Sequence, residues 1–129
     1  MLEFPAVAKL RVEFFASPRD NVKPGDVLTL TLILENASRK PMRGLVLAVP
    51  VPYGASALEG WLYRDAVRAE EGAFFGEGTE LAELAPGART AFMWKLLVEE
   101  GEEPLRLVPQ IWGAVTAISG AEAIEISRC

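Results

Sequence analysis

The chain has 129 residues, a length that fits one domain; half of them are hydrophobic and 24% are charged. This composition is typical of a folded globular protein and excludes an intrinsically disordered chain. The net charge of −5 repels the phosphates of nucleic acids and of anionic lipids, so we expect neither class of partner. Because the sequence contains no histidine, His-based catalytic triads and imidazole metal sites are excluded.

The ends of the chain carry little information about function. Cys129 is the only cysteine, so no intramolecular disulfide forms, and we expect an exposed terminal residue. Residues 1–10 do not resemble a signal peptide, because charged residues and a proline interrupt their apolar run. No stretch approaches the ~18 apolar residues of a membrane-spanning helix, so we expect no membrane insertion. The location stays unknown: cytoplasmic if Met1 is the native start, cell envelope if the domain was excised from an exported chain.

Strand signals begin near the start of the chain. Apolar and charged residues alternate over Lys9 to Ala16, which predicts a first strand, and a Ser-Pro-Arg-Asp-Asn run ends it. A Pro-Gly turn over Val22 to Asp26 then precedes an alternating strand from Val27 to Glu35. Proline presets the first central turn position, and glycine accepts the positive φ of the next. We expect Asp26 to cap this turn.

The middle of the chain is less regular. Gly44 to Val51 is apolar on both faces, which predicts a strand in the centre of a sheet, and the prolines at 50 and 52 end it. Farther on, Asp65 to Glu71 is compatible with a helical turn. Gly72 to Gly78, with two phenylalanines between glycines, is predicted to form a short strand or the tip of a hairpin. A further short strand is expected over Glu80 to Leu84.

A second Pro-Gly turn, Leu84 to Ala88, precedes an alternating strand from Arg89 to Val98. In both copies the residues four, six, eight and ten places after the proline share one phase, so we expect both strands to bury the same face. These residues are Leu28, Leu30, Leu32 and Leu34 in the first copy and Thr90, Phe92, Trp94 and Leu96 in the second. Further strands are expected from Leu105 onward and around Ile124. The pattern predicts an all-β, immunoglobulin-like β-sandwich of about seven to nine mainly antiparallel strands, formed by residues 1–129 as one domain.

These motifs together resemble the immunoglobulin-like "conserved repeat" domains of bacterial surface proteins and the related cell-adhesion-related domains. The resemblance covers about Val22 to Val98 and rests on the Pro-Gly-Asp turn, the strand that ends in Asn36, the Pro-x-Gly element at Pro52 to Gly54 and the later Pro-Gly turn. It implies a stalk, spacer or adhesion module without a catalytic site. The chain departs from the family pattern at Pro50, where an Asp is frequent, and in carrying a single copy of the domain.

Two groups of oxygen-bearing side chains are candidates for chemistry. Clustered glutamates could act as paired glycosidase carboxylates, but charge runs are more typical of a solvated edge. Asp20, Asn21 and Asp26 offer calcium ligands, yet they lack EF-hand spacing and are expected to shape turns. We therefore expect no enzyme, no cofactor and no metal. The glutamates are Glu70, Glu71, Glu77, Glu80 and Glu83.

Aromatic residues are the remaining candidates for contact with a ligand or a partner. Trp94 has the buried phase and is expected in the core. Trp61 and Tyr63 share one parity, and Trp112 has the opposite parity to Ile111, so these three are candidates for exposure; the alternative is that each closes a core edge. The sequence thus predicts a non-catalytic structural or protein-interaction module that engages a protein partner or a second copy. The alternative is a module that binds carbohydrate or a small ligand through exposed aromatics.

Overall fold

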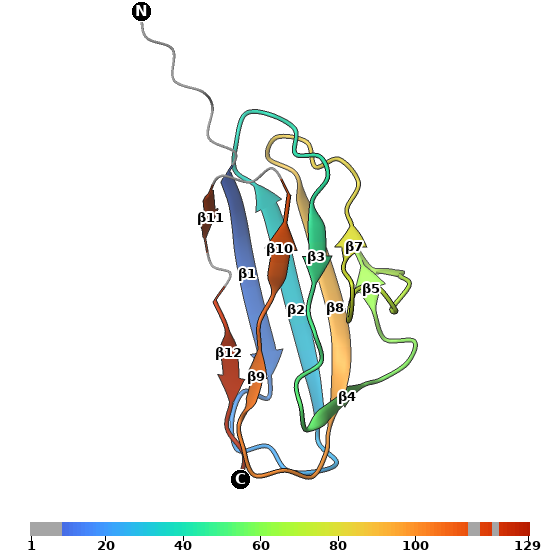
Figure 1. The fold of residues 1–129 in the computed structure, drawn as a ribbon, viewed down its shortest axis with the longest axis vertical. Coiled ribbons are helices and arrows are strands. Elements are labelled where there is room, and N and C mark those ends of the chain that lie inside the picture. Colours follow the sequence, from blue (N-terminus) through green and yellow to red (C-terminus); the bar gives the residue numbers. More distant parts are fainter. Residues whose placement is uncertain (1–8, 114–116, 120–121) are drawn as a thin grey trace, which may run out of the picture.

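The computed structural model describes residues 9–113, 117–119 and 122–129, and in this part of the chain every regular element is a strand (Figure 1). No helix in this part is long and apolar enough to cross a membrane. The strands are β1 (Lys9–Ser17), β2 (Val27–Asn36), β3 (Val46–Ala48), β4 (Ala55–Ala57), β5 (Tyr63–Arg64), β6 (Val67–Arg68), β7 (Thr79–Glu80), β8 (Arg89–Val98), β9 (Leu105–Leu107), β10 (Gln110–Trp112), β11 (Ala117–Ser119) and β12 (Ile124–Ile126).

One layer is a seven-stranded sheet with the order β11-β1-β2-β8-β5-β6, in which β4 also pairs with β8. At its centre β2 and β8, the two strands that follow the Pro-Gly turns, are antiparallel neighbours. Leu30 lies opposite Trp94 and Leu32 opposite Phe92, and all eight residues of the predicted common phase are buried. The prediction that both strands bury the same phase is therefore confirmed.

The second layer consists of the sheet β10-β3-β7 and the pair β12-β9, and it lies in front of β1, β2 and β8 in Figure 1. β3 is central in its sheet, as predicted, and Leu47 within it is buried. Buried side chains of both layers meet in one hydrophobic core, to which Leu105 and Ile126 belong. Most pairings are antiparallel; β1 with β11 is parallel. This two-layer arrangement confirms the predicted all-β sandwich.

The first Pro-Gly turn has the predicted cap. The Asp26 carboxylate accepts a hydrogen bond from the Lys23 backbone N–H at 3.0 Å, and the Asp26 N–H donates to the Lys23 carbonyl at 3.0 Å. Gly25 has φ 96° and Gly87, in the second turn, has φ 75°, values that only glycine adopts without steric cost. These motif residues therefore shape the fold and remain outside any candidate site.

Three segments differ from the prediction because tertiary contacts decide them. The strand expected over Glu80 to Leu84 is replaced by β7, which shares only Glu80 with that range. Residues 65–71 do not form a helical turn: β5 and β6 make a hairpin whose turn residues, Asp65 and Ala66, have φ 50° and 67°. Residues 72–78 form turns and no strand, and Phe74 within them is fully buried. The described residues hold twelve strands, more than predicted, because β5, β6 and β7 have two residues each and leave no alternating pattern.

Candidate functional site

The three aromatic residues singled out by the sequence lie on opposite faces of the sandwich. Tyr63 lies opposite Met93 on the outer face of the seven-stranded sheet, and the ring centres of Trp61 and Tyr63 are 6.4 Å apart. Trp112 lies opposite Val46 and projects from the other layer. Trp61 is 44% exposed and Trp112 is 47% exposed. Both tryptophans therefore reach solvent, but only Trp61 and Tyr63 belong to one surface.

Strand register places a row of side chains across the outer face of the large sheet. Phe15 of β1 lies opposite Thr31 of β2, Thr31 opposite Met93 of β8, and Met93 opposite Tyr63 of β5. Phe15 is 53% exposed and Met93 is 46% exposed. We call this row, together with Trp61, the outer patch. Thr31 and Tyr63 are half-buried between and beside them. Exposed apolar side chains that gather on one surface mark a contact site more strongly than scattered ones do.

The outer patch contains an open hollow of about 320 Å³ between β8 and the β5–β6 hairpin. Its walls are almost entirely apolar, and the hydroxyl groups of two residues are the polar side-chain groups in the lining. A hollow of this kind favours an apolar side chain or ring over a charged group, which would lose its hydration there. The lining residues are Thr31, Tyr63, Ala66, Ala91, Phe92 and Met93.

Asp65 fixes the hairpin wall of the hollow to β8. Its carboxylate accepts hydrogen bonds from the Thr90 hydroxyl at 2.9 Å and from the Ala91 N–H at 2.8 Å, and its own N–H donates to the Ala91 carbonyl at 2.8 Å. Arg64 Nε also donates to Thr90 Oγ1, at 3.1 Å. These bonds hold the neighbouring Ala66 in the left-handed region, which costs a non-glycine residue about 1–2 kcal/mol.

Replacing Ala66 with glycine is therefore expected to raise the free energy of unfolding by about 0.5–1 kcal/mol. Glycine adopts this φ without strain, and its larger freedom in the unfolded chain offsets only part of the gain. Urea denaturation followed by circular dichroism measures the change. Ala82→Gly, at an exposed position without a positive φ, is the control and should lose stability. A similar loss in both variants would contradict the strain at Ala66.

Positive charge flanks the aromatic pair of the outer patch. The Nζ of Lys95 lies 4.0 Å from the centre of the Trp61 ring. Arg68 lies opposite Tyr63 in the hairpin ladder, and one of its guanidinium nitrogens is 2.9 Å from where a Cβ on Gly60 would stand. In the described part of the chain neither Lys95 nor Arg68 forms a salt bridge. Two cations outside any described salt bridge thus accompany this surface on a chain of net charge −5, with Glu71 bound to the N–H of Gly60 near the Arg68 guanidinium.

The position of Lys95 bears on the carbohydrate alternative. A sugar ring stacks on an open aromatic face, but the Lys95 ammonium covers one face of Trp61. The planes of Trp61 and Tyr63 meet at 63°, so the two rings form no flat platform. Trp112 is on the opposite layer and adds nothing to this surface. The aromatic residues of this surface therefore offer no flat, open platform on which a sugar ring could stack.

The far end of the same face carries paired charges. Arg11 Nη1 and Glu35 Oε2 are 3.0 Å apart, and Arg89 Nη2 and Glu13 Oε2 are 3.8 Å apart. These four side chains and Ile33 line a second hollow of about 240 Å³. The two arginines here thus have anionic neighbours, unlike Lys95 and Arg68, which form no salt bridge among the described residues.

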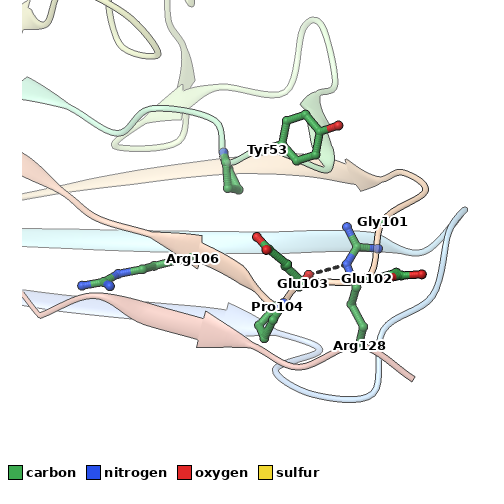
Figure 2. Close-up of a pocket in the computed structure, with 8 residues that line it drawn as sticks. Tyr53, Gly101, Glu102, Glu103, Pro104, Arg106 and Arg128 are labelled. Carbon is green, nitrogen blue, oxygen red and sulfur yellow. Dashed lines mark hydrogen bonds between the residues drawn. The ribbon is translucent and has the colours of Figure 1, made fainter.

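A further groove, of about 350 Å³, lies at the end of the sandwich where the C-terminus is found (Figures 1 and 2). Figure 2 shows Tyr53 on one side of this groove and Glu103 and Pro104 on the other. Tyr53 is 95% exposed, the highest value among the large hydrophobic residues that the structure describes. The sequence did not predict this groove, because its walls come from segments that are about 50 residues apart in the chain. The lining residues are Pro52, Tyr53, Gly101, Glu102, Glu103, Pro104, Arg106 and Arg128.

Arg128 joins the two walls of this end groove. Its Nε donates to the Glu103 carbonyl at 2.6 Å, its Nη1 to the Glu99 carbonyl at 2.8 Å and its Nη2 to the Gly54 carbonyl at 3.3 Å. A Cβ on Gly54 or Gly101 would clash with this guanidinium. The turn that carries Tyr53 and the glutamate-rich loop are therefore held in a defined relative position.

The remaining candidates from the sequence have other surroundings. Glu71 Oε1 accepts a hydrogen bond from the Gly60 N–H at 2.8 Å, and Glu83 pairs with Arg43 at 3.1 Å. Within residues 9–113, 117–119 and 122–129, no group of three or more His, Cys, Asp and Glu side chains is placed to hold a metal ion. Cys129 is an exposed free thiol.

Comparison with known proteins identifies the fold. No family model matches the chain, and no curated protein matches it. The structure is similar to the crystal structure of BcpA, the major pilin subunit of Bacillus cereus, with a TM-score of 0.60 and 8% identity over 92% of this chain and 40% of the pilin chain. Pseudomonas fluorescens alkylpurine DNA glycosylase AlkC bound to DNA containing an abasic site analog gives a TM-score of 0.48, with 15% identity over 95% of this chain and 31% of that one. The chain thus spans less than half of either protein, and at these identities the pilin similarity concerns the fold, which agrees with the predicted immunoglobulin-like sandwich.

Proposed function

We propose that this chain is a non-catalytic structural module that binds another protein through the outer patch. The observation that carries the proposal is the row of Phe15, Thr31, Met93 and Tyr63 across four strands, in which Phe15 and Met93 are exposed and Thr31 and Tyr63 are half-buried. Aromatic and methionine side chains are enriched in protein interfaces. The sandwich fold shared with a pilin subunit supports a structural role, as does the resemblance of the turn motifs to conserved-repeat and cell-adhesion-related domains.

We also propose that the chain has no catalytic activity. Acid–base chemistry requires titratable groups that converge on one site, and the hollow of the outer patch has an apolar lining with only hydroxyl groups. The carboxylate closest to it in sequence, Asp65, uses both oxygens to hold the hairpin on β8. The chain also contains no histidine. These features support a binding surface in preference to an active site.

Met93→Lys tests the proposal, because it places a charge at the centre of the outer patch without disturbing the core. We expect binding to a partner protein to weaken at least about tenfold, since an interface would have to desolvate the new ammonium. The matched control is Trp112→Lys, at a residue of nearly equal exposure on the opposite layer. Proteins captured from the source cells by each variant are quantified against wild type, and self-association is followed by light scattering. Unchanged binding by Met93→Lys, or a loss only in Trp112→Lys, would refute the proposal.

A further inference from the structure

We infer that the protein bound by the outer patch is a second copy of this chain, which docks with the end that carries Tyr53. The inference rests on the proposed function and names its partner. We call Tyr53, Glu102 and Glu103 the donor end. The acceptor is the outer patch with its hollow and its two flanking cations, Lys95 and Arg68.

The apolar chemistry of the two surfaces is complementary. The hollow is apolar and open, so it suits a ring, and Tyr53 presents an almost fully exposed ring at the end of the sandwich. A tyrosine that leaves water needs a partner for its hydroxyl, and two residues that carry a hydroxyl, Thr31 and Tyr63, belong to the lining. Tyrosine also loses little conformational entropy on binding, because it has only two side-chain torsions.

The charges of the two surfaces are also complementary. Glu102 and Glu103 accompany Tyr53 in the end groove together with Arg106 and Arg128, and in the described part of the chain none of these four forms a salt bridge. The Arg128 guanidinium is directed at backbone carbonyls, and Arg106 points away from the two glutamates in Figure 2, so both carboxylates are free to meet cations of another copy. Lys95 and Arg68, which flank the acceptor, have no anionic partner there either. Two copies of a chain with net charge −5 repel each other in general, so association requires such a local match.

Both surfaces are pre-organised, which lowers the entropic cost of association. Arg128 ties the turn next to Tyr53 to the glutamate-rich loop through three backbone carbonyls. On the acceptor, Asp65 ties the hairpin wall to β8. Neither surface therefore has to fold in order to bind.

The inferred contact is heterologous, because an end of one copy meets a face of the next. A dimer formed in this way still has one free donor end, on one copy, and one free acceptor, on the other, so association is open-ended and does not stop at a dimer. The contact is small, and small interfaces are weak, so we expect the mean mass to rise steadily between about 10 µM and 1 mM.

Two variants of the full chain test this arrangement. Tyr53→Ala removes the ring of the donor end, and Met93→Lys blocks the acceptor; both residues are exposed, so both variants should fold, as circular dichroism will verify. Each variant alone should remain monomeric in light scattering at up to about 1 mM. An equimolar mixture should form a one-to-one dimer, because one intact donor end and one intact acceptor remain. Glu100→Lys, in the same loop but outside the groove lining, should associate like wild type, whereas Glu103→Lys should not.

The outcomes separate this inference from the proposed function. Monomeric wild type at about 1 mM, or wild-type-like association by both single variants, would overturn the second-copy inference. Failure of the mixture to form the dimer would overturn it as well. In any of these cases the proposed function stands if Met93→Lys loses a partner captured from the source cells and Trp112→Lys keeps it. Should Met93→Lys fail to fold, Lys95→Glu serves as the acceptor variant in the same mixing experiment.

Discussion

We expect Phe74→Ala to lower the free energy of unfolding by about 3–5 kcal/mol, the usual cost of truncating a buried phenylalanine. The Phe74 ring is fully buried, and its centre lies 4.9 Å from that of Trp94 and 5.3 Å from that of Phe92. Its removal leaves a cavity against the inner face of β8 and frees the loop of residues 72–78. Urea denaturation measures the loss. Since domains of this kind are stabilised by about 5–15 kcal/mol, the variant should unfold at a much lower urea concentration.

The neighbouring Phe75 supplies the control. It is only partly buried and contacts the edges of Phe74 and Trp94, at ring-centre distances of 5.1 and 6.4 Å. Phe75→Ala should therefore lose about 1–2 kcal/mol. Equal losses in the two variants would show that the loop as a whole, and not the Phe74 ring, closes this side of the core.

The second large effect is expected at Asn36, where Asn36→Asp should lose about 2–4 kcal/mol at neutral pH. The side chain is fully buried, and its Nδ2 donates to the carbonyls of Lys40 at 2.8 Å and Leu84 at 2.9 Å. A carboxylate cannot donate, so it would leave two carbonyl oxygens facing a buried negative charge. Thermal denaturation measures the loss.

The pH dependence of this variant is a further check. Burial beside carbonyl oxygens raises the pKa of the introduced carboxyl, so the variant should recover stability as the pH falls and the protonated group donates one hydrogen bond. Ser38→Ala is the control: the Ser38 hydroxyl donates to Asn36 Oδ1 at 2.6 Å, but its loss leaves both amide donors of Asn36 in place. It should cost no more than about 1 kcal/mol. A comparable loss in the two variants would contradict the role assigned to the Asn36 amide.

Asn36 has one role that the sequence predicts and one that it does not. In the sequence it is only the polar residue that ends an alternating strand. The structure shows that it ties the turn that follows β2 to the segment before β8, since Leu84 is 48 residues away. Its backbone joins the same segment, because its N–H donates to the Ala88 carbonyl and its carbonyl accepts from Gly87. The strand end was predictable from periodicity, but the link to Leu84 was not.

The candidate site was predictable in part. Trp61, Tyr63 and Trp112 were candidates for exposure from parity, and the two tryptophans are indeed exposed. Their separation onto two layers was not predictable, because parity places a side chain on one face of its own strand and carries no information about which sheet the strand joins. Phe15 and Met93 become part of the same surface only through the register of four strands.

The sequence by itself determined the features that depend on neighbouring residues: the all-β class, the two Pro-Gly turns with the Asp26 cap, and the phase that β2 and β8 bury. These follow from a two-residue periodicity and from backbone preferences at proline and glycine, which act within a few positions. Only the tertiary structure decided the outer patch, the place of Phe74 in the core and the Arg128 contacts at the donor end. Each of these joins segments distant in the sequence, and the free energy of such contacts depends on strand register and packing that no local pattern encodes.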